Sequence, residues 1–142
     1  MTQEMTAGSH NHGPCAECDC QEERLKNNAL NHEQQLAALT EEKQFQATVV
    51  EYAEWHGWWH YHTRDSRGSE PGFPDWAFLR DGVLVLAELK AQGGRLQPGT
   101  WSKSGRYYPG QQEWLDALAA VPGLVVRLWR PSDWDEIEAV LR

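Results

Sequence analysis

Two β-type runs separated by two turn residues constrain this chain more than any other feature of its sequence. The runs cover residues 76–80 and 83–90, and Asp81-Gly82 between them is the two-residue signature of a type I′ hairpin. Both faces of the ribbon are largely apolar. We therefore expect its two strands to lie in the middle of a covered sheet.

The length of the turn determines which residues of the two strands face each other. Arg80 pairs with Val83 across a two-residue turn, so the same register continued outward sets Asp75 opposite Glu88. Opposed residues point to one face of the sheet, with Cβ atoms roughly 4.5–5.5 Å apart. Lys90 lies two residues beyond Glu88 and shares that face. Two like charges repel in this arrangement, so a shared proton or a bound cation has to offset the repulsion.

Two carboxylates that converge with a lysine suit a hard divalent cation. Mg²⁺ takes one or two protein carboxylates and leaves other positions for water and phosphate oxygens. Such a cation polarises a phosphodiester and lowers the pKa of a bound water. Lys90 is then suited to orient or deprotonate that water, or to stabilise developing negative charge. The structural alternative is an ordinary surface hairpin with an Asp at its start and a Glu-Leu-Lys end.

Two predicted helices carry further candidate site residues. Glu42 and Gln46 are one turn apart beside the apolar stripe of the first helix, and Gln111 shares the stripe of Trp114 and Leu115 in a later one. Each also has a purely structural interpretation. Glu42 complements a helix dipole, and Gln111 neighbours a helix N-terminus.

The predicted elements follow the order α-β-β-β-α-β-α, which indicates an α/β (α+β) fold with a mixed sheet flanked by helices. Residues 1–24 lack apolar periodicity and are expected to form a disordered tail, followed by an additional helix at 25–39 and a folded domain at 40–142. Thr40 is the expected N-cap of the domain's first helix, which ends near Gly57. The other predicted elements are strands at 58–62 and 124–129, loops at 63–74 and 91–109, and helices at 111–121 and from Pro131 onward.

The formal net charge of −8 argues at first against a nucleic-acid partner. The charge is unevenly distributed, because residues 60–110 hold five acids against seven bases, whereas residues 1–44 hold eight acids against three bases. A cation held by some of those five acids would make the local field more positive still. The overall acidity therefore weakens the case for a nucleic-acid partner without excluding it.

No apolar stretch approaches the ~20 residues of a membrane span, and the polar start lacks the apolar region of a signal peptide. We therefore expect a cytoplasmic protein with no membrane partner.

The loops that flank the hairpin combine basic and aromatic side chains, among them Trp101 and Tyr108. Basic groups contact phosphates and aromatic rings stack on unpaired bases. A solvated loop whose aromatic rings fold onto the domain is the alternative, and His62 has a comparable choice between the site and the core. The predicted nucleic-acid contacts are Arg64, Ser66, Arg67, Arg95, Lys103, Arg106 and Tyr107.

The N-terminal tail concentrates metal-type side chains, namely His10, His12, Cys15, Cys18 and Cys20. Zinc sites normally draw their ligands from both ends of a longer loop, so we do not expect structural zinc here. The three cysteines are also too close together to staple a fold. A zinc-sensing regulator that works through this tail is kept as a third hypothesis.

An ordered set of motifs resembles the VRR-NUC nucleases, a branch of the PD-(D/E)XK, restriction-endonuclease-like superfamily. The resemblance covers about residues 40–142 and includes residues 129–134 near the end. Its motifs are Glu42-X-X-Phe45-Gln46, His62-Thr63-Arg64-Asp65-Ser66-Arg67, Gly72-Phe73-Pro74-Asp75, Glu88-Leu89-Lys90, and Gly94-Arg95-Leu96 followed by Gln111.

The resemblance implies a restriction-endonuclease-like αβββαβ core and phosphodiester hydrolysis that depends on Mg²⁺ or Mn²⁺. It implies Asp75, Glu88 and the Leu89 backbone carbonyl as metal ligands, and Lys90 as the catalytic lysine. Glu42, also as a metal ligand, and Gln111 would complete the site. Residues 97–110 depart from the family by lengthening the step to the glutamine, which leaves Gln111 and Gln112 as alternatives. The spacing to Trp114 favours Gln111.

The resulting prediction is a Mg²⁺- or Mn²⁺-dependent deoxyribonuclease without an organic cofactor. Stand-alone family members of this size resemble phage or bacterial proteins, some of them dimeric junction resolvases, so we expect structure-selective cleavage of junction, flap or single-strand-containing DNA. A homodimer is expected because cutting two strands with one site per chain takes two copies. The alternative is a non-catalytic DNA-binding accessory module of a replication, recombination or packaging complex.

Overall fold

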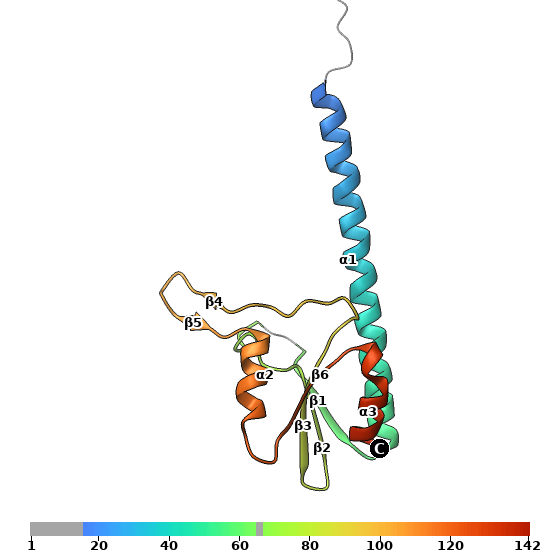
Figure 1. Ribbon diagram of the computed structural model, residues 1–142, viewed down its shortest axis with the longest axis vertical. Helices are drawn as coiled ribbons and strands as arrows, with labels where there is room; N and C mark the ends of the chain where they lie inside the picture. The colour runs from blue at the N-terminus through green and yellow to red at the C-terminus, as the bar shows by residue number, and fades with distance from the viewer. Residues whose placement is uncertain (1–15, 65–66) are drawn as a thin grey trace, which may run out of the picture. The chain divides into compact units, whose positions relative to one another are not determined.

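The computed structural model describes residues 16–64 and 67–142, with side chains from residue 31 onward. The chain divides into two compact units, Met1–Leu36 and Ala37–Arg142. The described part of the first unit is helical and belongs to α1 (Ala16–Trp55), which continues into the second unit (Figure 1). The second unit contains every strand among the described residues.

The boundaries predicted for the N-terminal region are wrong where the structure describes them. Residues 16–24 are helical rather than disordered, and α1 passes through Thr40 without a break. No glycine or proline occurs between residues 16 and 55, and Glu, Gln, Ala and Leu predominate there, so nothing in the sequence ends the helix. The rest of the predicted tail, with His10, His12 and Cys15, lies outside the described residues.

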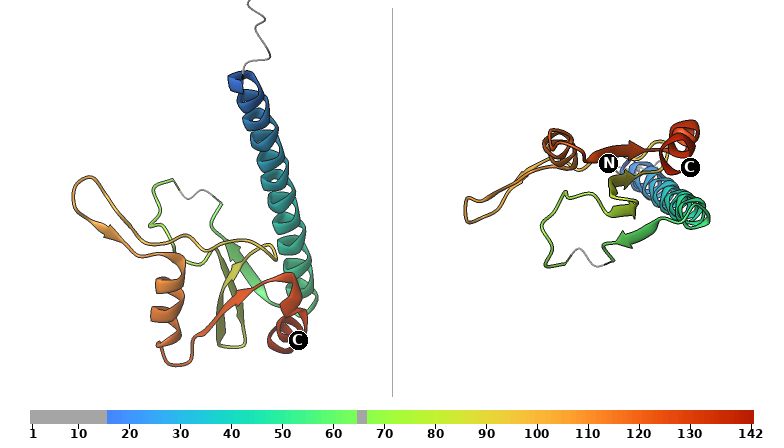
Figure 2. Two further views of the ribbon diagram at one scale, coloured as in Figure 1. Left: turned by 45° about the horizontal axis from the view of Figure 1, so that its top comes forward. Right: turned by 90° about the horizontal axis from the view of Figure 1, so that it is seen from below.

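A four-stranded mixed sheet in the order β1-β2-β3-β6 organises the second unit. Strands β1 (Trp59–His62), β2 (Trp76–Arg80) and β3 (Val83–Leu89) are antiparallel, whereas β6 (Val125–Trp129) runs parallel to β3. Helix α2 (Gln111–Ala119) lies on the connection between β3 and β6 (Figure 2). The 3-10 turn η1 (Pro131–Asp133) and helix α3 (Trp134–Leu141) complete the chain. The predicted mixed sheet with helices is confirmed, and two short strands that were not predicted lie between β3 and α2.

The predicted hairpin register is confirmed pair by pair. Arg80 pairs with Val83 and Trp76 pairs with Ala87, so Asp75 and Glu88 are the next positions outward. Asp81 and Gly82 have φ angles of 48° and 76°, and a type I′ turn requires positive values at both.

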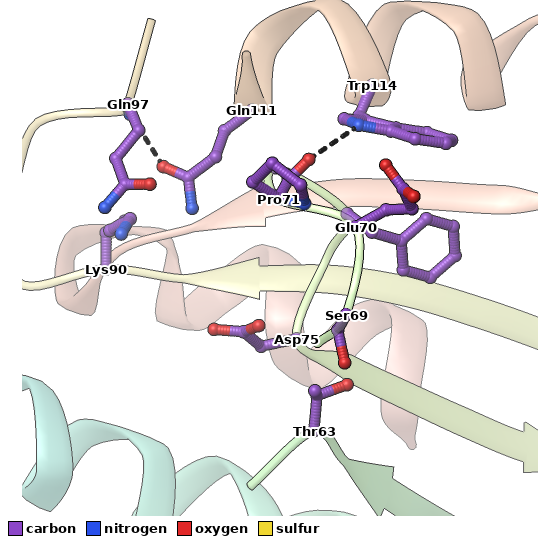
Figure 3. Close-up of a pocket in the computed structure, with 11 residues that line it drawn as sticks. Thr63, Ser69, Glu70, Pro71, Asp75, Lys90, Gln97, Gln111 and Trp114 are labelled. Carbon is purple, nitrogen blue, oxygen red and sulfur yellow. Dashed lines mark hydrogen bonds between the residues drawn. The ribbon is translucent and has the colours of Figure 1, made fainter. Parts of the chain in front are cut away.

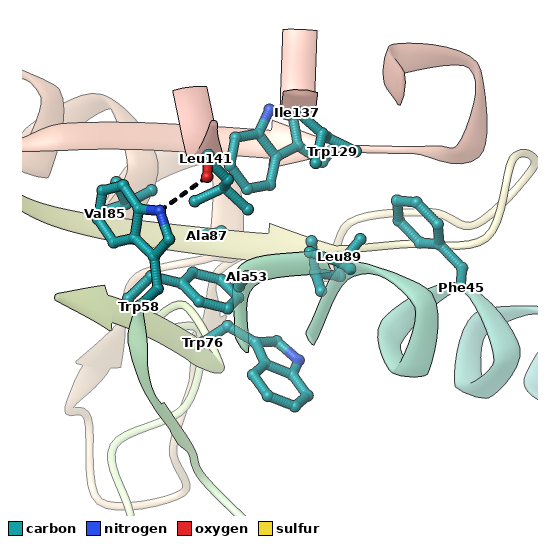
Figure 4. Packing of buried hydrophobic residues seen from close by; sticks show 12 residues of the cluster. Phe45, Ala53, Trp58, Trp76, Val85, Ala87, Leu89, Trp129, Ile137 and Leu141 are labelled. Carbon is teal, nitrogen blue, oxygen red and sulfur yellow. Dashed lines mark hydrogen bonds between the residues drawn. The ribbon is translucent and has the colours of Figure 1, made fainter. Parts of the chain in front are cut away.

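One face of the sheet is covered by α1 and α3 and forms the main core (Figure 4). Phe45, Val49 and Ala53 are the buried positions of α1 among the side chains described from residue 31 onward, and they recur at the four-residue spacing of one helix face. The Trp58 indole Nε1 donates to the Leu141 carbonyl at 2.8 Å and ties the last helix to the start of β1. The sheet contributes Trp76, Phe78, Val85, Ala87, Leu89 and Trp129 to this core.

The opposite face is covered only in part, so the predicted burial of both faces is wrong. Leu86 and Glu88 are buried there, and so is Leu115 of α2. Leu79 and Leu84, which lie nearer the turn of the hairpin, remain exposed. The buried end of this face is the end that carries the candidate site.

The loop predicted at 91–109 contains two short strands, β4 (Thr100–Trp101) and β5 (Tyr107–Tyr108), which pair as a separate two-stranded sheet. Within the described residues, no helix combines the length and the apolar character that a membrane crossing needs.

Candidate metal centre

A cavity of about 610 Å³ opens at the end of the hairpin where β2 begins and β3 ends. Asp75, Lys90 and Gln111 lie on its wall, and Thr63 and Gln97 face it from neighbouring loops (Figure 3). These residues come from three separate parts of the chain. The predicted Asp75, Lys90 and Gln111 are therefore brought together around one space.

Glu88 is 2% exposed and contacts Lys90 and Gln111, two residues that line this cavity. Its Oε1 accepts a hydrogen bond from Gln111 Nε2 at 2.8 Å and lies 3.2 Å from Lys90 Nζ. Its second oxygen, Oε2, is buried and has no hydrogen-bond partner among the described residues. A buried carboxylate oxygen without a partner is costly, because the desolvation of that oxygen is not compensated.

Burial and charge act on both carboxyls of the site. Burial raises the pKa of Asp75, and the charges of His62 and Lys90 oppose this rise. Burial also raises the pKa of Glu88, and the nearby Asp75 carboxylate raises it further. Lys90 and the nearby backbone N–H of Asp75 lower the pKa of Glu88 without cancelling the rise. The two carboxylates are thus close enough to repel each other, as the hairpin register predicts.

The structure distinguishes Gln111 from Gln112. Gln111 is buried, its backbone N–H donates to the Gln97 carbonyl at 3.0 Å, and its Oε1 accepts from the Gln97 N–H at 2.8 Å. Those two bonds turn Nε2 of Gln111 toward Glu88. Gln112 is exposed and bonds Asp116 at 2.8 Å on the outer side of α2. Gln111 is therefore the site glutamine.

The loop that precedes Asp75 packs against α2. Gly72 has a φ of +90°, and a Cβ there would lie 2.6 Å from the Pro109 carbonyl oxygen and 2.8 Å from Trp114 Cδ1. Trp114 Nε1 donates to the Pro71 carbonyl at 3.0 Å. The Trp114 and Phe73 rings pack edge to face with their centroids 5.3 Å apart. Only glycine fits this conformation and this close approach, so the Gly-Phe-Pro-Asp motif has a local structural reason.

Arg130 has a role that the sequence did not predict. Its Nη1 donates to the backbone carbonyls of Ala91 and Gly94, at 2.8 and 2.7 Å, and approaches that of Gln92 at 3.4 Å. These bonds hold the turn that directly follows Lys90. A lone arginine at the end of a strand gives no such signal, because its acceptors lie 36 to 39 residues away in the chain.

Glu42 has one described hydrogen-bond partner, which belongs to its own helix. It is half-buried on α1 and accepts from Gln46 Nε2 at 3.4 Å. Among the described residues, no three His, Cys, Asp or Glu side chains come together as a metal-holding group. The assignment of Glu42 as a metal ligand therefore stays a prediction, since helical periodicity gives its face of α1 but not its distance from β3. Leu89, the predicted carbonyl ligand, lies between Glu88 and Lys90 with its side chain in the core.

The predicted nucleic-acid contacts fall into two groups. Arg64, Arg67, Arg95 and Lys103 are exposed, and Ser66 lies outside the described residues. Arg106 pairs with Glu70 at 3.0 Å and lies over the Tyr108 ring, and the Tyr107 hydroxyl donates to Glu113 at 2.5 Å. The last two predicted contacts are thus engaged within the protein. His62 stacks on Trp76 with ring centroids 4.1 Å apart and is close enough to influence Asp75.

The side chains present fit a hard divalent cation in their chemistry. Two neighbouring carboxylates with raised pKa values, one of which has an unpartnered buried oxygen, form an oxygen-rich and under-compensated set of donors. Mg²⁺ and Mn²⁺ prefer such donors and retain room for water and phosphate oxygens.

Comparison with known proteins adds no relative. No family model matches the chain, and no curated protein or solved structure does. The resemblance to the VRR-NUC nucleases therefore stays a prediction that rests on the motifs and on the site itself.

Proposed function

We propose that this chain is a divalent-metal-dependent nuclease with a restriction-endonuclease-like core that hydrolyses DNA phosphodiester bonds. One observation carries the proposal. Glu88 is buried, its Oε2 has no partner among the described residues, and it lies close to Asp75 and Lys90, which line the cavity. A purely structural Glu–Lys pair has no reason to lie next to a second carboxylate, because the repulsion raises the cost of burial.

Asp75 and Glu88, with the Leu89 carbonyl, would hold Mg²⁺ or Mn²⁺. Such an ion polarises a phosphodiester and lowers the pKa of a bound water. The side chain of Lys90 is 14% exposed and is oriented by Glu88, so its ammonium group can hydrogen-bond a phosphate oxygen or the attacking water at the cavity wall. Gln111 orients the Glu88 carboxylate through Oε1 and leaves Oε2 for the ion.

The proposed substrate is DNA with a junction, flap or single-stranded segment, processed in a bacterial or phage-infected cytoplasm. The cavity is open, and three exposed arginines and Lys103 occur on loops of the same unit. Basic side chains around an acidic centre suit a phosphate backbone.

A cleavage assay tests the proposal. Linear, flap, four-way-junction and single-stranded DNA are incubated with the full chain, with Mg²⁺, with Mn²⁺ or with EDTA. We expect metal-dependent cleavage that falls at least about a hundredfold in Asp75→Ala and Lys90→Ala. Asp116→Ala and Lys43→Ala are matched controls, because both side chains are exposed and lie outside the site. Equal cleavage by all five proteins, or none by the wild type, contradicts the proposal.

A non-catalytic DNA-binding module is distinguished by metal titration. Calorimetry of the wild type with Mg²⁺ or Mn²⁺ should show binding that is lost in Asp75→Ala. DNA binding without any metal binding or cleavage would instead favour the accessory module.

A further inference from the structure

The β4–β5 hairpin presents a tryptophan to solvent. Trp101 is 72% exposed, and Tyr107 on the paired strand is its ring neighbour, with centroids 5.0 Å apart and planes tilted by 49°. A large aromatic surface left in water forgoes the stabilisation that burial would bring. The hairpin is also the segment that lengthens the chain between Leu96 and Gln111.

The tip of this hairpin is held by its own hydrogen bonds. The Ser102 N–H donates to the Arg106 carbonyl at 2.8 Å, and the Arg106 N–H donates to Ser102 Oγ at 2.9 Å. Gly105 closes the turn with a φ of +86° and donates to the Ser102 carbonyl at 3.0 Å. The Trp101 ring is therefore carried by an ordered strand end.

The base of the hairpin is fastened to the walls of the candidate site. The Tyr107 hydroxyl bonds Glu113 on α2, and Arg106 pairs with Glu70, which lines the site cavity. Gly99 and Gly110 leave no room for a Cβ where the two arms of the hairpin meet. These contacts fix the direction in which Trp101 is presented relative to Asp75 and Lys90.

A second cavity of about 220 Å³ leads from the site to the hairpin. It shares Pro71, Gly72 and Gln97 with the larger cavity, and it reaches Thr100 and Tyr108 at the hairpin base. Thr100 and Tyr108 form one cross-strand pair, and Trp101 and Tyr107 form the next pair, on the other face of the hairpin. Lys103 is exposed two residues beyond Trp101 and forms no ion pair with another residue in the described part of the chain.

We infer that Trp101, backed by Tyr107, is a stacking platform for an unpaired base, so that the protein takes DNA with a single-stranded segment. A duplex keeps its bases stacked inside, whereas an unpaired base offers a free face to an aromatic ring. Lys103 contacts the phosphate next to that base. The inference rests on the proposed function for its substrate, DNA, but not on cleavage.

Equilibrium binding in EDTA tests the platform without catalysis. Fluorescence anisotropy compares a labelled single-stranded oligonucleotide with a blunt duplex, using the full chain and its Trp101→Ala, Trp101→Phe and Trp55→Ala variants. We expect Trp101→Ala to weaken single-strand binding about 5- to 100-fold while duplex binding stays unchanged. Trp101→Phe should retain most of the affinity because it keeps a ring. Trp55→Ala is the matched control, since Trp55 is 82% exposed on α1 and lies outside both cavities.

A spectroscopic measurement reports stacking directly. 2-Aminopurine placed at successive positions of the single strand should be quenched at one or two positions by the wild type and not by Trp101→Ala. Circular dichroism and thermal unfolding confirm that each variant is folded.

The results distinguish base stacking at Trp101 from DNA cleavage. Unchanged single-strand affinity in folded Trp101→Ala, or wild-type binding no tighter to single strands than to duplex, overturns the platform even if the protein cleaves DNA. A Trp101 surface that serves a protein partner would give the first of these results. If Trp101→Ala loses single-strand binding and the wild type never cleaves DNA, the platform is supported and the proposed nuclease activity is overturned.

Discussion

The ionised carboxyl groups of Glu88 and Asp75 lower the stability of the folded protein. Burial keeps the pKa of both carboxyls above their ordinary values, and one Glu88 oxygen has no partner among the described residues. Sites of this kind are commonly stabilised when the functional group is removed, because the arrangement serves binding rather than folding.

The raised pKa values predict how stability depends on pH. Because the folded state holds the protons of Asp75 and Glu88 more tightly than the unfolded chain does, their penalty is absent at pH values below the ordinary pKa values of 3.8 and 4.5. The penalty appears as the pH rises through the raised folded-state values. In EDTA at pH 7, we expect Asp75→Asn to be about 0.5–2 kcal/mol more stable than the wild type. The difference should vanish near pH 3–4.

Urea unfolding across this pH range measures the effect. Asp116→Asn is the control and should show no pH-dependent gain, because Asp116 is exposed. Mg²⁺ should raise the stability of the wild type and not that of Asp75→Asn. A lower stability of Asp75→Asn at neutral pH would contradict the account of repelling carboxylates.

Gln111 and Gln112 provide a matched pair of neighbours. Gln111→Ala removes the bond to Glu88 and leaves the Gln97 N–H without its acceptor, so we expect a loss of about 1–3 kcal/mol in the free energy of unfolding. Gln112→Ala removes one exposed bond to Asp116 and should change stability by less than about 0.5 kcal/mol. Thermal unfolding compares them, and equal losses would show that Gln111 is not buried as described.

At the scale of elements, contacts between loops and α2 shape the site. The Gly72 loop, the Gln97 backbone and the start of α2 meet through hydrogen bonds and one aromatic contact. The register of β2 and β3 places Asp75 near Glu88, and residues of these loops and of α2 line the cavity beside Asp75.

A substitution at Gly72 tests whether the contact between this loop and α2 matters for metal binding. Gly72→Ala adds both a Cβ clash with the Pro109 carbonyl and a positive-φ penalty, whereas Gly68→Ala has the same kind of φ, +89°, with nothing within 4 Å. We expect Gly72→Ala to be about 1–3 kcal/mol less stable than Gly68→Ala, with weaker Mg²⁺ binding by calorimetry. If the two variants behave alike, backbone strain alone accounts for the need for glycine.

At the scale of the whole molecule, the residues of the main core fall between Phe45 and Leu141. Residues 16–36 belong to the other compact unit and are helical in the described part. Because no described residue of this stretch belongs to the main core, we expect the second unit to fold without it.

Truncation tests this division. A fragment of residues 37–142 should unfold cooperatively within a few degrees of the full chain and should retain Mg²⁺ binding. A fragment of residues 57–142 lacks Phe45, Val49 and Ala53 and should fail to fold, because a core without those side chains loses several kcal/mol. A large drop in the melting temperature of 37–142 would place part of the stability in the first unit. Sedimentation of the full chain checks the predicted homodimer, which stays a prediction.

Sequence alone determined the hairpin, its register and the partnership of Asp75, Glu88 and Lys90, because turn length and the two-residue period of a strand are local rules. It also placed Gln111 on the inner face of α2. The tertiary structure alone decided which residues from distant segments meet. It brings Gln111 to Glu88, places Gly72 in close contact with Trp114, and gives Arg130 its backbone acceptors. Periodicity gives the face on which a side chain lies, whereas the distance to a partner depends on how helices and loops pack across the sheet.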